Sequence, residues 1–246
     1  MSLAGRCLLV TRPAGQSARL MSLLAAEHAR AIHFPVIELV ADSAALATLP
    51  AQVQGCDWLI FVSPGAIDIA WPALPPLPAG VRLACVGAAS AARLAALSGR
   101  EVLHPVHGSD SDALLQLPPM RDIDGARVLI VRGTGGRATL ASTLQERGAS
   151  IGFAEVYRRQ DGDPDWSVFD TDHPDAVILT SSEMVERLFY LAGPARAGQL
   201  QCLQYCVPHP RIAARLADFG VTRIMTTRAD DESLVAGLRE WFSSHP

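Results

Sequence analysis

Short apolar runs alternate with amphipathic stretches along the whole chain, and this alternation predicts its secondary structure. The apolar runs are rich in valine, isoleucine and leucine, as the strands of buried parallel sheets are. The stretches that follow them repeat apolar residues at helical spacing, for example Ile212, Leu216 and Phe219. Strands that alternate with helices are typical of α/β proteins. We predict strands at residues 7–11, 32–39, 57–62, 82–87, 101–104, 127–132, 151–157, 176–180, 202–207 and 222–226.

The same order of elements occurs twice, with a period of about 120 residues. The strand and turn at 8–13 are echoed at 129–134, and the run that begins at Asp57 is echoed by the run that begins at Asp175. A proline-rich insert at 71–78 interrupts only the first copy, where we expect a surface loop. The sequence therefore predicts an α/β fold with two similar, doubly wound parallel-sheet domains.

Composition narrows the class of protein. The chain has 246 residues, of which 49% are hydrophobic, enough to build a buried core. A formal net charge of -4 gives no support to general nucleic-acid binding. No apolar run is long enough to cross a membrane, and the N-terminus lacks the layout of a signal peptide. The five cysteines are irregularly spaced, so we expect free thiols and a cytoplasmic location.

The basic residues exclude several kinds of chemistry. All 21 are arginines, and the chain contains no lysine. A Schiff-base nucleophile, a pyridoxal-phosphate anchor and a P-loop lysine are therefore excluded. The seven histidines are scattered, and the cysteines lack the spacing of a metal knuckle, so we predict no metal site. A Gly-x-Ser-x-Gly elbow is also missing, which argues against a serine hydrolase.

The turns that follow the predicted strands are rich in arginine, glycine and hydroxyl groups. Free backbone N–H groups and the positive ends of helix dipoles gather at these turns in a parallel sheet. We therefore predict a site for carboxylates or phosphates. Ordinary helix capping is the alternative explanation for the serines. The candidate binding residues are Arg12, Ser63, Gly65, Gly87, Arg132, Gly133, Arg137, Ser181, Ser182, His209 and Arg211.

One of these turns also fits a nucleotide-binding pattern. Gly133-x-Gly135-x-x-Ala138 follows a strand and opens a helix, and Glu155 lies at a suitable distance to hold a ribose. The corresponding turn of the other copy, at 12–15, lacks the pattern. A nucleotide-dependent enzyme that uses residues 133–138 therefore stays as an alternative.

Three tyrosines are present, and their surroundings differ. Tyr190 lies in an apolar helix and Tyr205 in a strand, so we expect both in the core. Tyr157 ends a predicted strand and is followed by Arg158 and Arg159. A phenol with a pKa near ~10 is a hydrogen-bond donor at neutral pH, which makes Tyr157 the candidate catalytic residue. Packing at the end of a strand is the alternative.

Taken together, these motifs resemble the uroporphyrinogen-III synthase family in its proteobacterial form. The resemblance extends from residue 8 to the last helix and depends on the order, spacing and duplication of several weak motifs. The matching stretches are 10–13, 57–64, 84–87, 128–133 with Gly136 and Arg137, 156–158, 179–182 and 209–213.

The resemblance implies an arrangement of domains that the sequence pattern alone does not reach. Residues 1–34 together with 160–246 would form one α/β domain, and residues 40–153 would form the other. Strands at 35–39 and 154–159 would link them. The active-site cleft would lie between the two domains.

The resemblance also implies a reaction. The family's enzymes are lyases that close hydroxymethylbilane, an anionic linear tetrapyrrole, into uroporphyrinogen III with loss of water and inversion of the last pyrrole ring. Tyr157 resembles the family's tyrosine that assists departure of the hydroxyl, and the turn residues would bind the acetate and propionate arms. At 208–211 this chain reads Pro-His-Pro-Arg, where many relatives have a Gly-Pro-Thr-Thr-like turn, so Arg211 would replace a threonine there.

Neither a cofactor nor a metal is implied. We expect a monomer that binds a small molecule and neither nucleic acid nor membrane, with transient contact to the upstream deaminase that produces hydroxymethylbilane. A hinged small-molecule-binding module without catalysis is the second alternative, because two similar α/β domains also describe such proteins.

Overall fold

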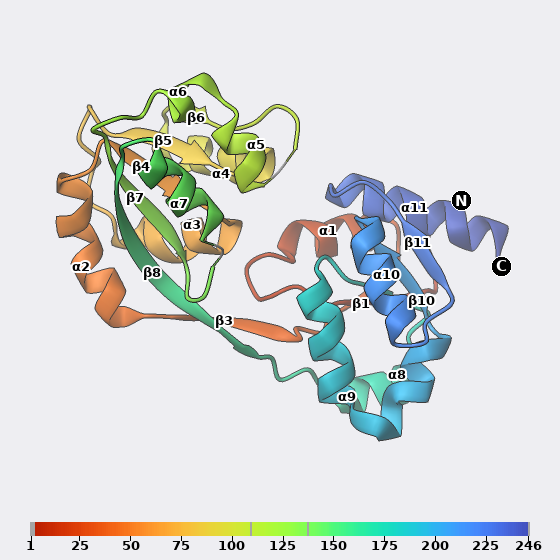
Figure 1. Cartoon of the computed structure of the whole chain (residues 1–246). Coiled ribbons are helices and arrows are strands. Elements are labelled where there is room, and N and C mark those ends of the chain that lie inside the picture. Colours follow the sequence, from red (N-terminus) through yellow and green to blue (C-terminus); the bar gives the residue numbers. More distant parts are fainter. Residues whose placement is uncertain (1–2, 109, 137, 246) are drawn as a thin grey trace. The chain divides into compact units, whose positions relative to one another are not determined.

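The computed structural model describes residues 3–108, 110–136 and 138–245. The chain forms two compact units (Figure 1). Unit 1 contains Met1–Glu38 and Gln160–Pro246, and unit 2 contains Leu39–Arg159. Each unit has its own sheet, so unit 2 is inserted into the chain of unit 1.

Unit 1 has a five-stranded sheet in the order β11-β10-β9-β1-β2, and its strands pair in parallel. Leu8, Val10 and Ile178 of the sheet pack with residues of α1 and α11 in one core. On the described residues of this unit, the strands are β1 (Cys7–Val10), β2 (Arg30–His33), β9 (Ala176–Ile178), β10 (Gln204–Val207) and β11 (Ile224–Thr226). The helices are α1 (Ala18–Ala26), α8 (Trp166–Asp172), α9 (Ser182–Cys202), α10 (Pro210–Asp218) and α11 (Asp231–Ser244).

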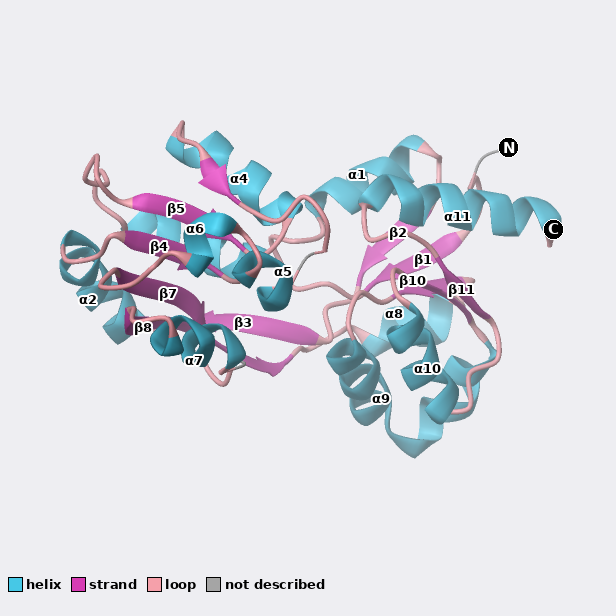
Figure 2. Cartoon of the chain, turned by 45° about the horizontal axis from the view of Figure 1, so that its top comes forward, coloured by secondary structure: helices cyan, strands magenta, loops and turns pink. Residues whose placement is uncertain are grey.

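Unit 2 has a six-stranded sheet in the order β3-β8-β7-β4-β5-β6 (Figure 2). The ladders from β8 to β6 are parallel. The strands are β3 (Ile37–Ala41), β4 (Trp58–Phe61), β5 (Arg82–Cys85), β6 (Val102–Leu103), β7 (Arg127–Gly133) and β8 (Ser150–Asp161). The helices are α2 (Ser43–Gln54), α3 (Pro64–Ala70), the short 3-10 helix η1 (Trp71–Ala73), α4 (Ala88–Ser98), α5 (Ser111–Leu115), α6 (Pro118–Arg121) and α7 (Thr139–Glu146).

Alternate residues of the central strand β4 enter two different cores. Leu59 and Phe61 pack with residues of α2, α3 and α4, whereas Trp58 and Ile60 pack with residues of α5, α6 and α7. Because successive side chains of a strand point to opposite faces, this sheet is covered by helices on both sides. The predicted α/β class with parallel sheets is confirmed.

The two sheets have the same strand order when their parts are matched. Strands β1, β2, β9, β10 and β11 of unit 1 correspond to β7, β8, β4, β5 and β6 of unit 2. Asp175 and Asp57 mark the equivalent positions. Each carboxylate accepts a hydrogen bond at 2.8 Å from the first backbone N–H of an equivalent strand, β1 for Asp175 and β7 for Asp57. The internal repeat of the sequence is therefore also a repeat of topology.

The register of this repeat differs from the predicted one by one residue. Trp58 pairs with Val128, and Ala176, which follows Asp175, pairs with Leu8. Leu8 therefore corresponds to Val128 and not to Leu129. The same shift makes Arg12 equivalent to Arg132 and Pro13 equivalent to Gly133. Both registers align apolar runs of the same kind, but the observed one also aligns Arg12 with Arg132.

The prediction of a single strand at 32–39 is wrong. Pro35 interrupts it, since proline lacks an N–H donor and restricts the residue before it. The first part becomes β2 in unit 1 and the second becomes β3 beside β8. Phe34 is buried where the strand breaks, with its ring centroid 5.0 Å from that of Trp166.

Two predictions about α9 are also wrong. Tyr190 is 72% exposed and not part of the core. Gly193, at φ 63, and Pro194 interrupt the helix just beyond it. Cys202 ends α9 and does not lie on a strand. Tyr205, by contrast, is buried as predicted and donates to the carbonyl of Leu200 at 3.0 Å.

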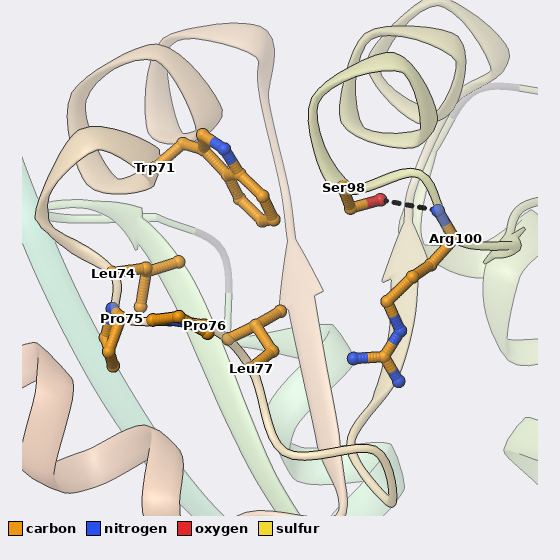
Figure 3. Close-up of a pocket in the computed structure, with 7 residues that line it drawn as sticks. All are labelled: Trp71, Leu74, Pro75, Pro76, Leu77, Ser98 and Arg100. Atoms are coloured by element: carbon orange, nitrogen blue, oxygen red, sulfur yellow. Dashed lines mark hydrogen bonds between the residues drawn. The ribbon is translucent and has the colours of Figure 1, made fainter.

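The proline-rich insert forms η1 and a loop beside the end of α4. It lines a pocket of about 400 Å³ together with Ser98 and Arg100 (Figure 3). The Ser98 hydroxyl accepts from the Arg100 backbone N–H at 3.2 Å. Across the described residues, the search for a helix that could cross a membrane finds none.

Candidate active site

The sequence-predicted residues of unit 2 gather at one edge of its sheet, where the parallel strands end. Ser63 follows β4 and caps α3, Gly65 lies in the first turn of α3, and Gly87 follows β5 and precedes α4. Gly133 is the last residue of β7. The backbone N–H groups at the starts of α3 and α4 therefore face the same edge, as a site for anions needs.

The side chains of Ser63 and Tyr157 form a hydrogen bond at this edge. The Ser63 hydroxyl accepts a hydrogen bond from the backbone N–H of Ala66 at 3.1 Å, which caps α3. The same oxygen lies 3.1 Å from the Tyr157 hydroxyl, and either group can be the donor. The capping explanation of Ser63 is therefore correct, but it accounts for only part of what this side chain does.

Arg159 reaches the same tyrosine from two positions along β8. Its Nη2 donates to Tyr157 Oη at 3.3 Å, and its guanidinium carbon lies 5.5 Å from the centroid of the ring. Residues two apart on a strand share a face, which is why the arginine and the tyrosine meet. Arg159 is not among the candidate residues predicted from the sequence. Its spacing of two residues from Tyr157 predicts that both side chains lie on one face, provided that the strand continues to Asp161.

Gly133 makes room for the tyrosine ring. A Cβ atom at this position would lie 2.4 Å from Tyr157 Cε2, far inside van der Waals contact. The ladder is also irregular here, because β8 has a bulge opposite Arg132 and Gly133. The backbone N–H of Thr134 donates to the Tyr157 carbonyl at 2.8 Å. The absence of a side chain at 133 therefore allows the ring to lie here.

Tyr157 is a core residue as well as a polar one. Only 1% of it is exposed, and it belongs to the core cluster that contains Phe61 and Val131. The strand does not end at Tyr157 as predicted, since β8 continues to Asp161. Burial and two hydrogen-bond partners together hold the phenol in one orientation.

Arg132 and Glu155 are paired with each other. Arg132 Nη2 lies 3.1 Å from Glu155 Oε1, and its guanidinium carbon lies 4.8 Å from the ring centroid of Phe153. The ring of Tyr157 covers Gly133, and Glu155 accepts a hydrogen bond from Arg132. These two residues of the nucleotide pattern therefore already have partners within unit 2. This geometry does not favour the nucleotide alternative. Arg137 lies outside the described residues.

The predicted residues of unit 1 gather at the corresponding edge of its sheet. Arg12 forms an ion pair with Asp231, with 2.7 Å between Nη1 and Oδ1, and both side chains are largely buried. Ser181 caps α9 by accepting from the N–H of Met184 at 3.2 Å. The Ser182 hydroxyl is buried, and within the described residues no hydrogen-bond partner reaches it.

His209 and Arg211 lie where β10 leads into α10. His209 caps this helix, with Nδ1 accepting from the backbone N–H of Arg211 at 3.0 Å. The Arg211 side chain is exposed, and no carboxylate in the described part of the chain pairs with it. It is therefore the arginine of this edge best placed to meet an anion from solvent.

Pockets of substantial volume lie at the opposite edge of the unit 2 sheet. One of about 350 Å³ is lined by Trp58 and Arg82, the first residues of β4 and β5. Ligands of parallel sheets collect at the other ends of the strands, so this pocket is not the candidate site. No group of three histidines, cysteines or acidic residues that could hold a metal occurs among the residues described.

Taken together, the unit 2 edge combines a buried phenol, a hydroxyl, an arginine and two helix N-termini. The phenol and hydroxyl can transfer a proton. The guanidinium and the N–H groups can stabilise negative charge.

Comparison with known proteins gives one consistent result. The family model described as Uroporphyrinogen-III synthase HemD matches residues 18–236. Uroporphyrinogen-III synthases of Salmonella typhimurium and Escherichia coli are each 32% identical over 250 residues, which cover 94% of this chain and 99% of each relative. A putative uroporphyrinogen-III synthase of Methanothermobacter thermautotrophicus is 27% identical and covers 94% of the chain.

Two solved structures share the fold. A mutant uroporphyrinogen III synthase from Thermus thermophilus matches with a TM-score of 0.62 and 18% identity, covering 98% of this chain and 100% of that one. A uroporphyrinogen-III synthetase from Helicobacter pylori matches with a TM-score of 0.62 and 14% identity, covering 96% and 99%. The match to the family model and the 32% identity over nearly the full length show that the chain belongs to the uroporphyrinogen-III synthase family.

Proposed function

We propose that this chain closes hydroxymethylbilane into uroporphyrinogen III and that Tyr157 is the acid of the reaction. Enzymes of this family are lyases. The observation that carries the assignment of Tyr157 is its buried phenol, held at 3.1 Å from Ser63 Oγ and at 3.3 Å from Arg159 Nη2. A neutral phenol is a proton donor at physiological pH.

The reaction begins with the loss of a hydroxyl group. Hydroxide is a poor leaving group, and a proton supplied as the C–O bond breaks lets it depart as water. Arginine can only donate hydrogen bonds, so Arg159 occupies a lone pair of Tyr157 Oη and leaves the phenolic proton available. The guanidinium also stabilises the negative charge that develops on that oxygen.

The azafulvene cation that remains is attacked by the last pyrrole ring through a substituted carbon, which gives a spiro intermediate. This intermediate fragments and recloses with the ring reversed. Closure without the enzyme gives the uninverted isomer, so the protein has to hold the chain in the conformation that leads to inversion.

Binding of the acetate and propionate arms would keep the substrate in that conformation. We propose that the N–H groups at Gly65, Gly87 and Gly133 and the hydroxyls of Ser63, Ser181 and Ser182 contact the arms. A hydrogen bond to a charged group is worth roughly 1.5–3 kcal/mol, so a few such contacts suffice to select one conformer. The other proposed contacts are His209, Arg12, Arg132, Arg137 and Arg211.

The proposed arginine contacts differ in whether a protein carboxylate already pairs with them. Arg12 and Arg132 are already paired with Asp231 and Glu155, so each would have to exchange a protein carboxylate for a substrate one. Arg211 is exposed, which favours it as a first contact. It also occupies the turn at which this sequence departs from the family pattern.

We also propose that the domains of this enzyme are residues 1–34 with 160–246, and residues 40–153, with 35–39 and 154–159 as linkers. The compact units, whose boundaries fall at 38–39 and 159–160, support this division. The paths of β3 and β8, the two segments in which the chain passes from one unit to the other, support it as well.

A cytoplasmic monomer that transiently contacts the upstream deaminase is the proposed working state. The five cysteines are free thiols, as a reducing compartment favours. Four residues of the apolar stripes of α10 and α11 are buried inside unit 1, so these side chains do not offer an association surface: Ile212, Leu216, Leu234 and Leu238. Light scattering that gives the mass of a single chain would support the monomer, and a dimer mass would contradict it.

The isomer of the product tests the proposed function. Freshly generated hydroxymethylbilane is incubated with the purified chain, and the product is oxidised and resolved into isomers I and III. We expect predominantly isomer III. For Tyr157→Phe we expect the rate of isomer III formation to fall by roughly 10²-fold or more, the usual contribution of a general acid.

The outcomes separate the two parts of the proposal. Isomer I alone, formed at the uncatalysed rate by well-folded wild-type protein, would overturn the activity and favour the binding-module alternative. Isomer III from wild type together with a full rate for Tyr157→Phe would keep the activity and remove the acid role of Tyr157.

A further inference from the structure

We infer that Ser63 hands the proton of Tyr157 to the leaving hydroxyl of the substrate, so that Ser63 is a catalytic residue and not only a helix cap. This inference rests on the proposed function, in which Tyr157 is the acid. It follows from the number of donors and acceptors at two oxygen atoms, Ser63 Oγ and Tyr157 Oη.

Each of these oxygens already accepts one hydrogen bond from a fixed donor. Ala66 N–H donates to Ser63 Oγ at 3.1 Å, and Arg159 Nη2 donates to Tyr157 Oη at 3.3 Å. Neither an amide N–H nor a guanidinium can reverse its role. The bond of 3.1 Å that joins the two oxygens therefore uses one of the two remaining hydroxyl protons.

Burial decides which proton it uses. Tyr157 is 1% exposed, and within the described residues Ser63 Oγ is the one acceptor in hydrogen-bond distance of its hydroxyl. If Ser63 donated to Tyr157, the phenolic proton would be buried without an acceptor, which costs free energy. The phenol therefore donates to Ser63.

Ser63 is then left with one free proton and a suitable position. Its oxygen accepts from Ala66 and Tyr157, so its own O–H points elsewhere. Unlike Tyr157, Ser63 is partly exposed, at the edge where β4 ends and α3 begins. A substrate at this edge reaches the serine hydroxyl, whereas the phenol lies behind it.

The proton transfers balance without a further reactant. Ser63 gives its proton to the leaving hydroxyl as the C–O bond breaks, with the bonding electrons moving to oxygen and water departing. Tyr157 gives its proton to Ser63, and the phenolate rests beside Arg159. The last pyrrole ring loses one proton when it recloses, and that proton returns through Ser63 to Tyr157.

Substitutions at Ser63 separate the transfer of a proton from the capping of α3. Ser63→Ala removes both functions. Ser63→Asn keeps an acceptor for the Ala66 N–H but offers no acidic hydroxyl, whereas Ser63→Thr keeps both. We expect kcat for isomer III to fall by roughly 10²-fold in the alanine and asparagine variants, a larger change than the rise in KM that follows from losing the proposed contact between Ser63 and a substrate arm. The threonine variant should retain most of the wild-type rate.

The double variant gives the sharpest test. Two residues that pass the same proton act as one unit, so Ser63→Ala with Tyr157→Phe should be no slower than the slower single variant. Asp42→Ala is the matched control, because Asp42 caps α2 of the same unit through Ala45 N–H at 3.0 Å. It should lower the denaturant midpoint and leave kcat unchanged.

The inference is overturned if Ser63→Asn, folded as judged by near-UV circular dichroism, turns over at the wild-type kcat. It is also overturned if Ser63→Ala raises KM alone, or if its effect multiplies with that of Tyr157→Phe; a serine that only binds a carboxylate arm gives these results. Failure of the proposed function looks different, because wild type itself would then produce isomer I.

Discussion

The two units share one topology but differ in the turn that follows the equivalent strands β1 and β7. Arg12 of unit 1 and Arg132 of unit 2 occupy equivalent positions, and each pairs with a carboxylate of its own unit, Asp231 or Glu155. The next residue is Pro13 in unit 1 and Gly133 in unit 2. The arginine is thus a shared part of the scaffold, and the residue after it distinguishes the units.

This single difference determines where a tyrosine can lie. The ring of Tyr157 occupies the space that a Cβ at 133 would need. The strand in unit 1 equivalent to β8 ends at His33, just before Phe34 and Pro35, and leads into β3 of the other sheet. The duplicated fold therefore supplies helix N-termini to both units, whereas the buried phenol of Tyr157 beside a capping serine lies in unit 2.

The two capping serines, Ser63 and Ser181, show the same kind of difference between the units. Ser63 and Ser181 occupy equivalent positions and accept from the N–H three residues later, at 3.1 and 3.2 Å. Ser63 also contacts Tyr157, whereas Ser181 is followed by Ser182, whose hydroxyl is buried. The cap belongs to the fold, and the second contact of Ser63 is the one that we propose to act in the reaction.

The largest expected contrast lies in thiol reactivity. Burial raises the pKa of Cys85 in unit 2 and of Cys206 in unit 1 to about 12 each. At pH 8 such a thiol carries about a thousandfold less thiolate than an ordinary cysteine. We expect a thiol reagent to modify the exposed Cys202 in the folded protein and to leave Cys85 and Cys206 unmodified.

The same two thiols report the stability of each unit. The core clusters that contain Cys85 and Cys206 are formed by residues of unit 2 and unit 1, respectively. We therefore expect pulse labelling across a denaturant series, read by mass spectrometry of the peptides, to give two midpoints. Coincident midpoints would show that the units unfold as one and would contradict the expectation that they differ in stability.

Gly133→Ala should bring the next largest effect. The added methyl overlaps the ring of Tyr157, and overpacking of this kind costs about 1–3 kcal/mol of unfolding free energy. Displacement of the hydroxyl from Ser63 should also slow isomer III formation, by about a hundredfold if the shift reaches 1 Å. Denaturant unfolding and the isomer assay measure the two effects.

Gly198→Ala provides the control in the other unit. Gly198 lies in α9 with no atom within 4 Å of an added Cβ, so alanine should stabilise the helix by up to about 1 kcal/mol. Its activity should stay at the wild-type level. An active, undisturbed Gly133→Ala would refute the idea that this glycine makes room for the phenol.

Much of this arrangement could be predicted from sequence because it is local. A serine before a helix signals a cap, and the order of strands and helices signals parallel sheets. The candidate residues Ser63, Ser181 and Gly87 stand at helix starts for these reasons. Tyr157 could be singled out because it ends the apolar part of its strand.

What could not be predicted depends on contacts between distant residues. Arg12 and Asp231 are 219 positions apart, so nothing in the turn at Arg12 reveals that its guanidinium is already paired. The continuation of β8 beyond Tyr157 is masked by its polar residues, and with it the approach of Arg159. The break at Pro35 was legible in principle, but the apolar run on both sides of it favoured one strand.

The smallest expected effect concerns the carboxylate that anchors β4 to β7. Asp57 accepts from the side chain and the backbone N–H of Arg127, and these hydrogen bonds lower the pKa of Asp57. A carboxyl group with a lowered folded-state pKa stabilises the protein above its unfolded pKa of about 3.9, and this contribution is lost as the pH falls through the folded value. Asp57→Asn should therefore lower the unfolding midpoint of unit 2 at pH 7, and the difference from wild type should shrink as the pH falls below about 3.9 and through the lowered folded-state value. Because thiol labelling is slow in acid, tryptophan fluorescence measures the acid arm, and labelling of Cys85 and Cys206 at neutral pH assigns the loss to a unit. A drop at Cys85 with Cys206 unchanged is expected. An equal drop at both thiols would mean that the anchors of the two sheets are coupled, and the equivalence of Asp57 and Asp175 would then be energetic as well as geometric.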